Sequence, residues 1–214
     1  MTETDWLSCN NPFEMLSFVR DSISQRKLRL FACACCRRIW HLLPCQENRD
    51  LVAAVENFPD GPIETRDLDE AIIATSKRER DFANDGGFWA AKNLGRSYYK
   101  LDPLSSAVTV AVKAARCTDD ARVEQAAQAD LLRDLVPNPF RTVEMAPGWL
   151  RWYIRAVIRS AQSIYDDRAS GQLSKLAHSL EEAGCSDSDI ISHCRGSASH
   201  FRGCWVVDLL LSKQ

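Results

Sequence analysis

The last quarter of the chain holds the residue types that could do chemistry. Three of the nine cysteines and three of the four histidines lie after residue 175. Two thiols and two imidazoles fall within twelve residues, at His193, Cys194, His200 and Cys204. Zinc takes four ligands of these kinds in a tetrahedron. One interpretation of the segment is therefore a zinc site on these four residues, closed over the loop between them.

The spacing of these residues also fits simple packing. It matches neither the C-x2-C nor the H-x3-5-H pattern of common zinc sites. On a helix the adjacent His193 and Cys194 point about 100° apart, so one ion seldom binds both. Cys33, Cys185 or His178 would then complete the set. In the packing interpretation, which the sequence favours, the thiols are small buried hydrophobes and the histidines bond backbone carbonyls.

A third interpretation is a nucleophilic thiol. His193 and Arg195 flank Cys194 and would lower its pKa, and Asp189 or Asp208 could supply an acidic partner. No protease or transferase signature surrounds this cysteine. Walker loops, G-x-G-x-x-G, H-E-x-x-H and G-x-S-x-G patterns do not occur in the chain either. We therefore expect no catalytic residues and a protein that is not an enzyme.

Five arginines could hold an anion or an acidic partner. Three of them recur every fourth residue and form a stripe on a predicted helix. A solvated face is the favoured interpretation of the stripe, because the net charge of −2 gives no bias toward nucleic acid. Nucleic-acid binding is not expected. The five residues are Arg151, Arg155, Arg159, Arg195 and Arg202.

Start and stop signals place the C-terminal residues on helices. Apolar residues at i, i+3, i+4 and i+7 predict a helix over 173–180, which Gly184 ends. Ser186 is the expected N-cap of a short second helix that ends at Gly196. The loop that follows carries the second histidine of the cluster. A last amphipathic segment, Trp205–Lys213, is too short for an independent helix and must be held by tertiary packing.

Helical periodicity extends over the rest of the chain. We predict an all-α fold of about eight to nine amphipathic helices in a compact array or bundle, with no substantial sheet. Cys33, Cys35 and Cys36 lie on one of these helices, where packing is the favoured role. The expected core aromatics are Trp40, Trp149, Trp152 and Trp205. The further predicted helices cover residues 12–21, 25–43, 48–58, 65–84, 104–117, 119–136 and 149–164.

The chain is long enough for one good core or two small ones. We expect a single helical domain over 1–214, with a possible division into lobes 1–84 and 101–214. Glycines and a weak pattern make 85–100 the expected variable link, with one or two helical turns at 88–94 and an irregular segment after Leu94.

Composition predicts a globular protein, with 45% hydrophobic and 26% charged residues. No apolar run reaches the ~18 residues of a membrane span, and the acidic first ten residues resemble no secretory signal. An odd number of cysteines then predicts reduced thiols in a cytoplasm. The sequence does not indicate an oligomeric state.

Three segments resemble a protein family of unknown function that is abundant in planctomycete (Gemmata-type) genomes. They are KLRLFACACCRRIWHLL (Lys27–Leu43), LLRDLVPNPFR (Leu131–Arg141) and HCRG…HFRGCWVVDLLL (His193–Leu211). The likeness covers nearly the whole chain and is loosest between Pro59 and Arg116. It implies a bacterial, cytoplasmic protein and brings no activity, substrate or catalytic residue.

These observations favour a non-enzymatic interaction or scaffold protein that presents a helical surface to a protein partner. The alternative is a small zinc-binding regulatory module built on the C-terminal Cys/His cluster. A thiol-dependent enzyme comes third. The three differ in what Cys194 and His200 do: pack, bind metal, or react.

Overall fold

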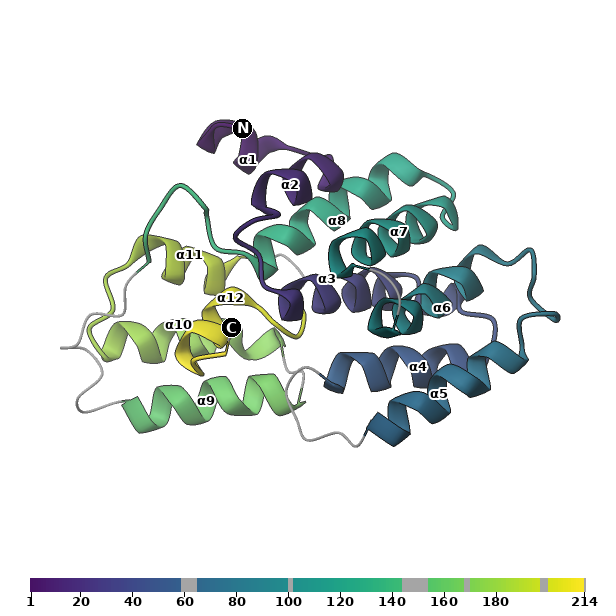
Figure 1. The fold of residues 1–214 in the computed structure, drawn as a ribbon. Helices are drawn as coiled ribbons and strands as arrows, with labels where there is room; N and C mark the ends of the chain where they lie inside the picture. The colour runs from purple at the N-terminus through teal and green to yellow at the C-terminus, as the bar shows by residue number, and fades with distance from the viewer. Residues whose placement is uncertain (59–64, 100–101, 144–153, 168–169, 197–199, 214) are drawn as a thin grey trace. The chain divides into compact units, whose positions relative to one another are not determined.

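The chain is built of helices. The computed structural model describes residues 1–58, 65–99, 102–143, 154–167, 170–196 and 200–213. Within these ranges it forms twelve α-helices and no strand (Figure 1), which confirms the all-α class and raises the expected helix count. One helix, α1 (Glu3–Ser8), has no counterpart among the predicted ones, and α6 (Gly86–Tyr99) is longer than the one or two helical turns predicted at 88–94. None of the described helices is both long and apolar enough to span a bilayer.

The helices belong to two compact units, which we call the central and the terminal unit. The central unit is Cys9–Leu132, and the terminal unit combines Met1–Ser8 with Arg133–Gln214. The expected link at 85–100 is not where the chain divides, because α6 covers residues 86–99 and packs on α7 and α4 inside the central unit. The division falls instead within the last turn of α8.

In the central unit, α3 (Gln25–Arg38) packs against three other helices, α4, α6 and α7 (Figure 1). Every residue from Leu30 to Cys36 is buried, as expected for a helix with neighbours on several sides. Cys33, Cys35 and Cys36 are each 0% exposed, so packing accounts for these three thiols. The other helices of this unit are α2 (Pro12–Val19), α4 (Gln46–Asn57), α5 (Thr65–Lys77), α6, α7 (Pro103–Arg116) and α8 (Ala121–Leu135).

Two arginines at the end of α3 pair with buried carboxylates. Arg37 Nη2 lies 2.6 Å from Glu56 Oε2, and the guanidinium of Arg37 lies 4.1 Å from the centroid of the Trp40 ring. Arg38 binds both oxygens of Glu124, at 2.9 and 3.1 Å from Nε and 2.9 Å from Nη2. The side chain of Glu124 is only 6% exposed. Trp40 is half-buried under the guanidinium of Arg37, whereas the sequence predicted it in the core.

The terminal unit contains α1, α9 (Ile154–Asp167), α10 (Leu173–Glu182), α11 (Ser188–Arg195) and α12 (Trp205–Leu210). Helix α10 packs on α9 and α11, and α12 packs on the same two helices. Trp205 is buried in this core, as predicted, whereas Trp149 and Trp152 lie outside the described residues. The core faces of α9 and α10 carry Val157, Ala161, Ile164, Tyr165, Leu173, Leu176, Ala177 and Leu180.

Polar contacts attach α1 to the rest of the terminal unit. Glu3 Oε1 accepts hydrogen bonds from Asn138 Nδ2 at 2.7 Å and from Arg141 Nε at 2.6 Å. Arg141 also binds Asp189 Oδ1 at 2.8 Å, so it links α1 to α11. The carbonyl of Trp6 accepts from the guanidinium of Arg133. The two ends of the sequence therefore build one unit together.

The predicted stop after α10 is confirmed in detail. Gly184 has φ 89°, and the amides of Cys185 and Gly184 donate to the carbonyls of Leu180 and Glu181, both at 2.9 Å. This pair of bonds is the Schellman arrangement, which needs a left-handed residue. We expect Gly184→Ala to lower the free energy of unfolding by about 1–2 kcal/mol in denaturant titrations.

Gly171→Ala is the matched control for this prediction. A Cβ at Gly171 meets nothing within 4 Å, so the substitution should change stability by less than about 0.5 kcal/mol. Equal effects of the two substitutions would contradict the role assigned to the left-handed glycine.

Candidate metal centre

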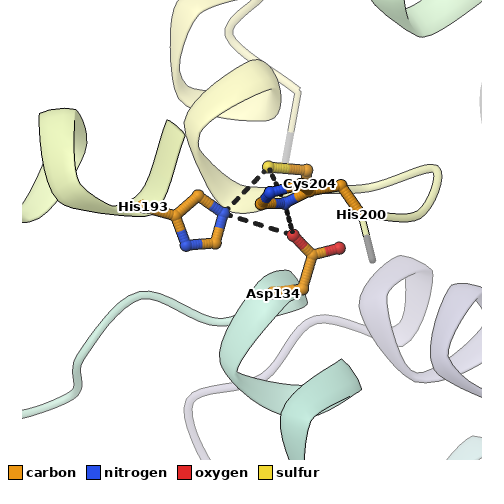
Figure 2. A group of neighbouring side chains, drawn as sticks. All are labelled: Asp134, His193, His200 and Cys204. Atoms are coloured by element: carbon orange, nitrogen blue, oxygen red, sulfur yellow. Dashed lines mark hydrogen bonds and ion pairs between the residues drawn. The ribbon is translucent and has the colours of Figure 1, made fainter. Parts of the chain in front are cut away.

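Four side chains of the terminal unit converge on one point. Asp134, His193, His200 and Cys204 each offer one ligand atom, and these atoms lie within 4.8 Å of one another (Figure 2). Asp134 Oδ1 lies 2.6 Å from His200 Nδ1 and 3.2 Å from His193 Nε2. Cys204 Sγ lies 3.2 Å from the same His193 Nε2 and 4.0 Å from His200 Nδ1. It is the only such group in the part of the chain that the structure describes.

These separations are close to those of a tetrahedral zinc site. Bonds of about 2.0–2.3 Å at tetrahedral angles place neighbouring ligand atoms about 3.3–3.6 Å apart. The four measured separations run from 2.6 to 4.0 Å and therefore bracket this value. Small side-chain shifts would bring all four atoms to bonding distance of one ion.

Different elements deliver the four groups. Asp134 lies in the last turn of α8, and His193 lies in the last turn of α11. His200 and Cys204 enclose a turn, which the bond from the Cys204 amide to the Phe201 carbonyl closes at 3.0 Å. Asp134 also holds this turn, because its Oδ2 accepts from the Phe201 amide at 2.8 Å.

The start of α11 sets the direction of His193. Asp187 is its N-cap, and the Asp187 carboxylate accepts from the amides of Asp189 and Ile190 at 2.9 and 3.1 Å. The predicted cap, Ser186, is wrong by one residue, because the carboxylate of Asp187 reaches these amides. Gly196 ends the helix as predicted, so His193 occupies the final turn.

The centre is closed to solvent. The side chains of Asp134 and His200 are 2% and 6% exposed, that of His193 is 15% exposed, and Cys204 is 2% exposed. Burial by itself would raise the pKa of Asp134, but hydrogen bonds from His193 and His200 and their charges lower it below the usual value. The carboxylate therefore stays ionised, and it supplies a fixed negative charge to the centre.

Cys204 is held as a neutral thiol. Burial, and then the charge of Asp134, raise the pKa of Cys204 well above its usual value. A cation bound at the centre would reverse this balance, because a thiol that coordinates a metal is deprotonated outright. The thiol is thus inert without a metal and a good ligand with one.

The structure brings together three of the four predicted metal ligands. His193, His200 and Cys204 belong to the group, but Cys194 does not, and Asp134 completes it. Cys194 is 1% exposed in the core of the terminal unit, where burial raises its pKa to about 12. The adjacency of residues 193 and 194 explains this outcome, because their side chains diverge on α11.

The other suggested ligands lie elsewhere. His178 is exposed on α10, Cys185 belongs to the core, and Cys33 lies in the central unit. One feature of the sequence could have identified Asp134 as a member of the group. It is an acidic residue among the apolar Leu131, Leu132 and Leu135 at the end of α8. A carboxylate on a buried helix face must be paired, which marks it as a candidate ligand.

The geometry does not fit a nucleophilic triad. In such a triad the thiol and the acid bind opposite nitrogens of one imidazole. Here Cys204 and Asp134 both face Nε2 of His193, and the opposite nitrogen, Nδ1, lies 3.1 Å from the indole nitrogen of Trp205. Convergence of all groups on one point is instead an arrangement that could hold a metal ion.

We expect no unusually reactive thiol in the native protein. Burial raises the pKa of Cys35, Cys36, Cys194 and Cys204. Iodoacetamide near neutral pH should therefore label the half-buried Cys9 first and these four only after unfolding, as peptide mass spectrometry would show. Rapid, selective labelling of Cys194 would restore the thiol-enzyme interpretation.

Two of the five arginines suggested for anion binding have side-chain partners within the terminal unit. Arg195 Nη2 lies 2.5 Å from Glu181 Oε2. The Nε of Arg202 donates to the Tyr165 hydroxyl at 3.1 Å, and its guanidinium lies 4.6 Å from the centroid of the Tyr165 ring. Arg155 and Arg159 are exposed on α9, and Arg151 lies outside the described residues.

Comparison with known proteins gives no function for the chain, so a proposal of function must be based on the metal centre. No family model, curated protein or solved structure matches the chain. The resemblance to a planctomycete family stays a prediction that these comparisons do not test.

Proposed function

We propose that this chain is a non-catalytic helical protein whose terminal unit is stabilised by one structural zinc ion. The ligands are Asp134, His193, His200 and Cys204. The observation that carries the proposal is the convergence of these four donor atoms, within 4.8 Å of one another, in a closed environment. The proposal departs from the packing interpretation that the sequence favours, because packing alone gives no reason for polar groups from three elements to meet.

The donor set favours zinc over other common cations. Thiolate and imidazole suit zinc, whereas magnesium and calcium bind oxygen ligands. Four protein ligands fill a tetrahedral coordination sphere and leave no position for a water or a substrate. A closed site of this kind is structural, which supports a protein that is not an enzyme.

A metal at this point would stabilise the terminal unit as a whole. It would connect the end of α8, the end of α11 and the turn before α12. Helix α12 has only six residues, too few to be stable by itself. Because metal binding free energy becomes folding free energy, zinc would keep these helices in place as a surface for a protein partner. The proposal of a protein partner comes from the scaffold interpretation of the sequence.

Metal content is the test of this function. Protein purified without a histidine tag should contain close to one zinc per chain by plasma mass spectrometry. Cobalt exchanged into the site should show a thiolate charge-transfer band, which Cys204→Ser removes. The control variant Cys194→Ser should keep both zinc and the band, because this thiol is not in the group. A metal-free chain with nine titratable thiols, unchanged by added chelator, would refute the proposal.

A further inference from the structure

We infer that Trp205 controls metal entry, because its indole holds His193 in the tautomer that cannot bind a metal. Trp205 is thus a positioning residue that acts through His193. The inference rests on the proposed zinc site and adds its regulation. It predicts that the loss of this tryptophan side chain strengthens metal binding.

The contact is direct and buried. Trp205 Nε1 lies 3.1 Å from His193 Nδ1, and the two rings lie 5.1 Å apart between centroids at an angle of 55°. Trp205 is 7% exposed. The His200 ring also packs edge-on against His193, at 4.9 Å and 69°. The imidazole of His193 is therefore in contact with two rings.

The donor and acceptor roles follow from the chemistry of the two rings. An indole nitrogen can only donate, so His193 Nδ1 must accept and carries no proton. The proton of the neutral imidazole then lies on Nε2. Figure 2 shows this nitrogen facing the cluster, where it lies 3.2 Å from Asp134 Oδ1 and 3.2 Å from Cys204 Sγ. A proton occupies the position that a metal needs.

Metal binding reverses these roles. A neutral imidazole that binds a metal through Nε2 carries its proton on Nδ1 and donates it to a neighbouring acceptor. In this state two N–H groups would face each other across the 3.1 Å contact. The indole must then rotate away from His193, and its hydrogen bond is lost.

The hydrogen bond to Trp205 consequently forms only in the metal-free state. A contact made only in that state opposes binding by its own free energy. Its removal in Trp205→Phe should tighten zinc binding about three- to tenfold, which is the net worth of one neutral hydrogen bond. A residue that supports a ligand in the usual way has the opposite effect, since its loss weakens binding about 10–100-fold.

Competition with a chromophoric chelator would measure the zinc affinity of the wild type and of Trp205→Phe. Val206→Ala is the control, because it removes buried volume from the same helix, and Val206 is no ligand. We expect tighter binding in Trp205→Phe and unchanged or weaker binding in Val206→Ala. Equal or weaker binding in Trp205→Phe would overturn the role of Trp205 and leave the zinc site in place.

A second measurement uses the wild-type chain and does not depend on the stability of a variant. The indole N–H resonance of Trp205, identified by its absence in Trp205→Phe or by sequential assignment, should shift on addition of zinc and exchange faster with solvent. An unchanged resonance at full zinc occupancy would overturn the inference alone. Failure of the wild type to bind zinc would overturn both the inference and the proposed function.

Discussion

Replacement of Asp134 by alanine should release the zinc and lower the free energy of unfolding of the terminal unit by about 3–5 kcal/mol, the cost of removing one partner from a buried ionic network. The carboxylate accepts from His193, His200 and the Phe201 amide, at 3.2, 2.6 and 2.8 Å. Without it, the metal loses its only carboxylate ligand and the Phe201 amide loses its acceptor. In the metal-free state, the two imidazoles lose their acceptor as well. Metal analysis and denaturant titration would measure the two effects.

Two variants distinguish the loss of a metal ligand from a general destabilisation of α8. Asp130 lies one turn earlier and is exposed, so Asp130→Ala should keep the zinc and change stability by less than about 1 kcal/mol. Asp134→Asn keeps the shape of the side chain but loses its charge, and it should also lose the zinc. Full zinc occupancy in Asp134→Ala would show that the carboxylate is not a ligand.

The second large effect lies in the central unit, at Glu124. Arg38 binds both oxygens of this carboxylate, and the side chains are 28% and 6% exposed. Gln128 Nε2 lies a further 3.4 Å from Glu124 Oε1. Glu124→Ala would leave the guanidinium of Arg38 partly buried without its carboxylate. We expect a loss of about 3–5 kcal/mol in the free energy of unfolding, measured by denaturant titration.

An exposed pair on α5 is the control for this prediction. Arg66 and Glu70 form an ion pair with side chains 76% and 63% exposed, so Glu70→Ala should cost less than about 1 kcal/mol. Joint replacement of Arg38 by methionine and Glu124 by leucine should recover most of the stability, because hydrophobic residues can replace a buried pair. Similar effects of Glu124→Ala and Glu70→Ala would contradict the argument.

Local signals in the sequence were sufficient for the helical class and for three of the four residues that the structure brings together in the candidate centre. Gly184 and Gly196 mark the ends of α10 and α11 as expected, and the helix pattern places His193 at the end of α11. These features depend on neighbouring residues alone. Asp134 was missed because it meets His200 across 66 positions of the chain, and no local pattern reports such a contact.

Glycines explain why only one or two turns of α6 were predicted. Gly86, Gly87 and Gly95 indicate breaks in a helix when they are considered by propensity alone. In the structure they allow close packing: a Cβ at Gly95 would lie 2.8 Å from Ile72 Cγ1, and one at Gly87 would lie 2.5 Å from the Leu42 carbonyl oxygen. Contacts with distant residues therefore override the local preference, and the same contacts place residues 85–100 inside a unit.

The joining of both ends of the sequence in the terminal unit has a consequence for synthesis on the ribosome. Helix α1 is made first, yet its partners Arg133, Asn138 and Arg141 follow 127, 135 and 138 residues later. The central unit is complete before these partners emerge, and domains fold as units during synthesis. Cys204 is the last of the four residues of the group to be made, so a metal at the proposed centre could be captured only after residue 204 has left the exit tunnel.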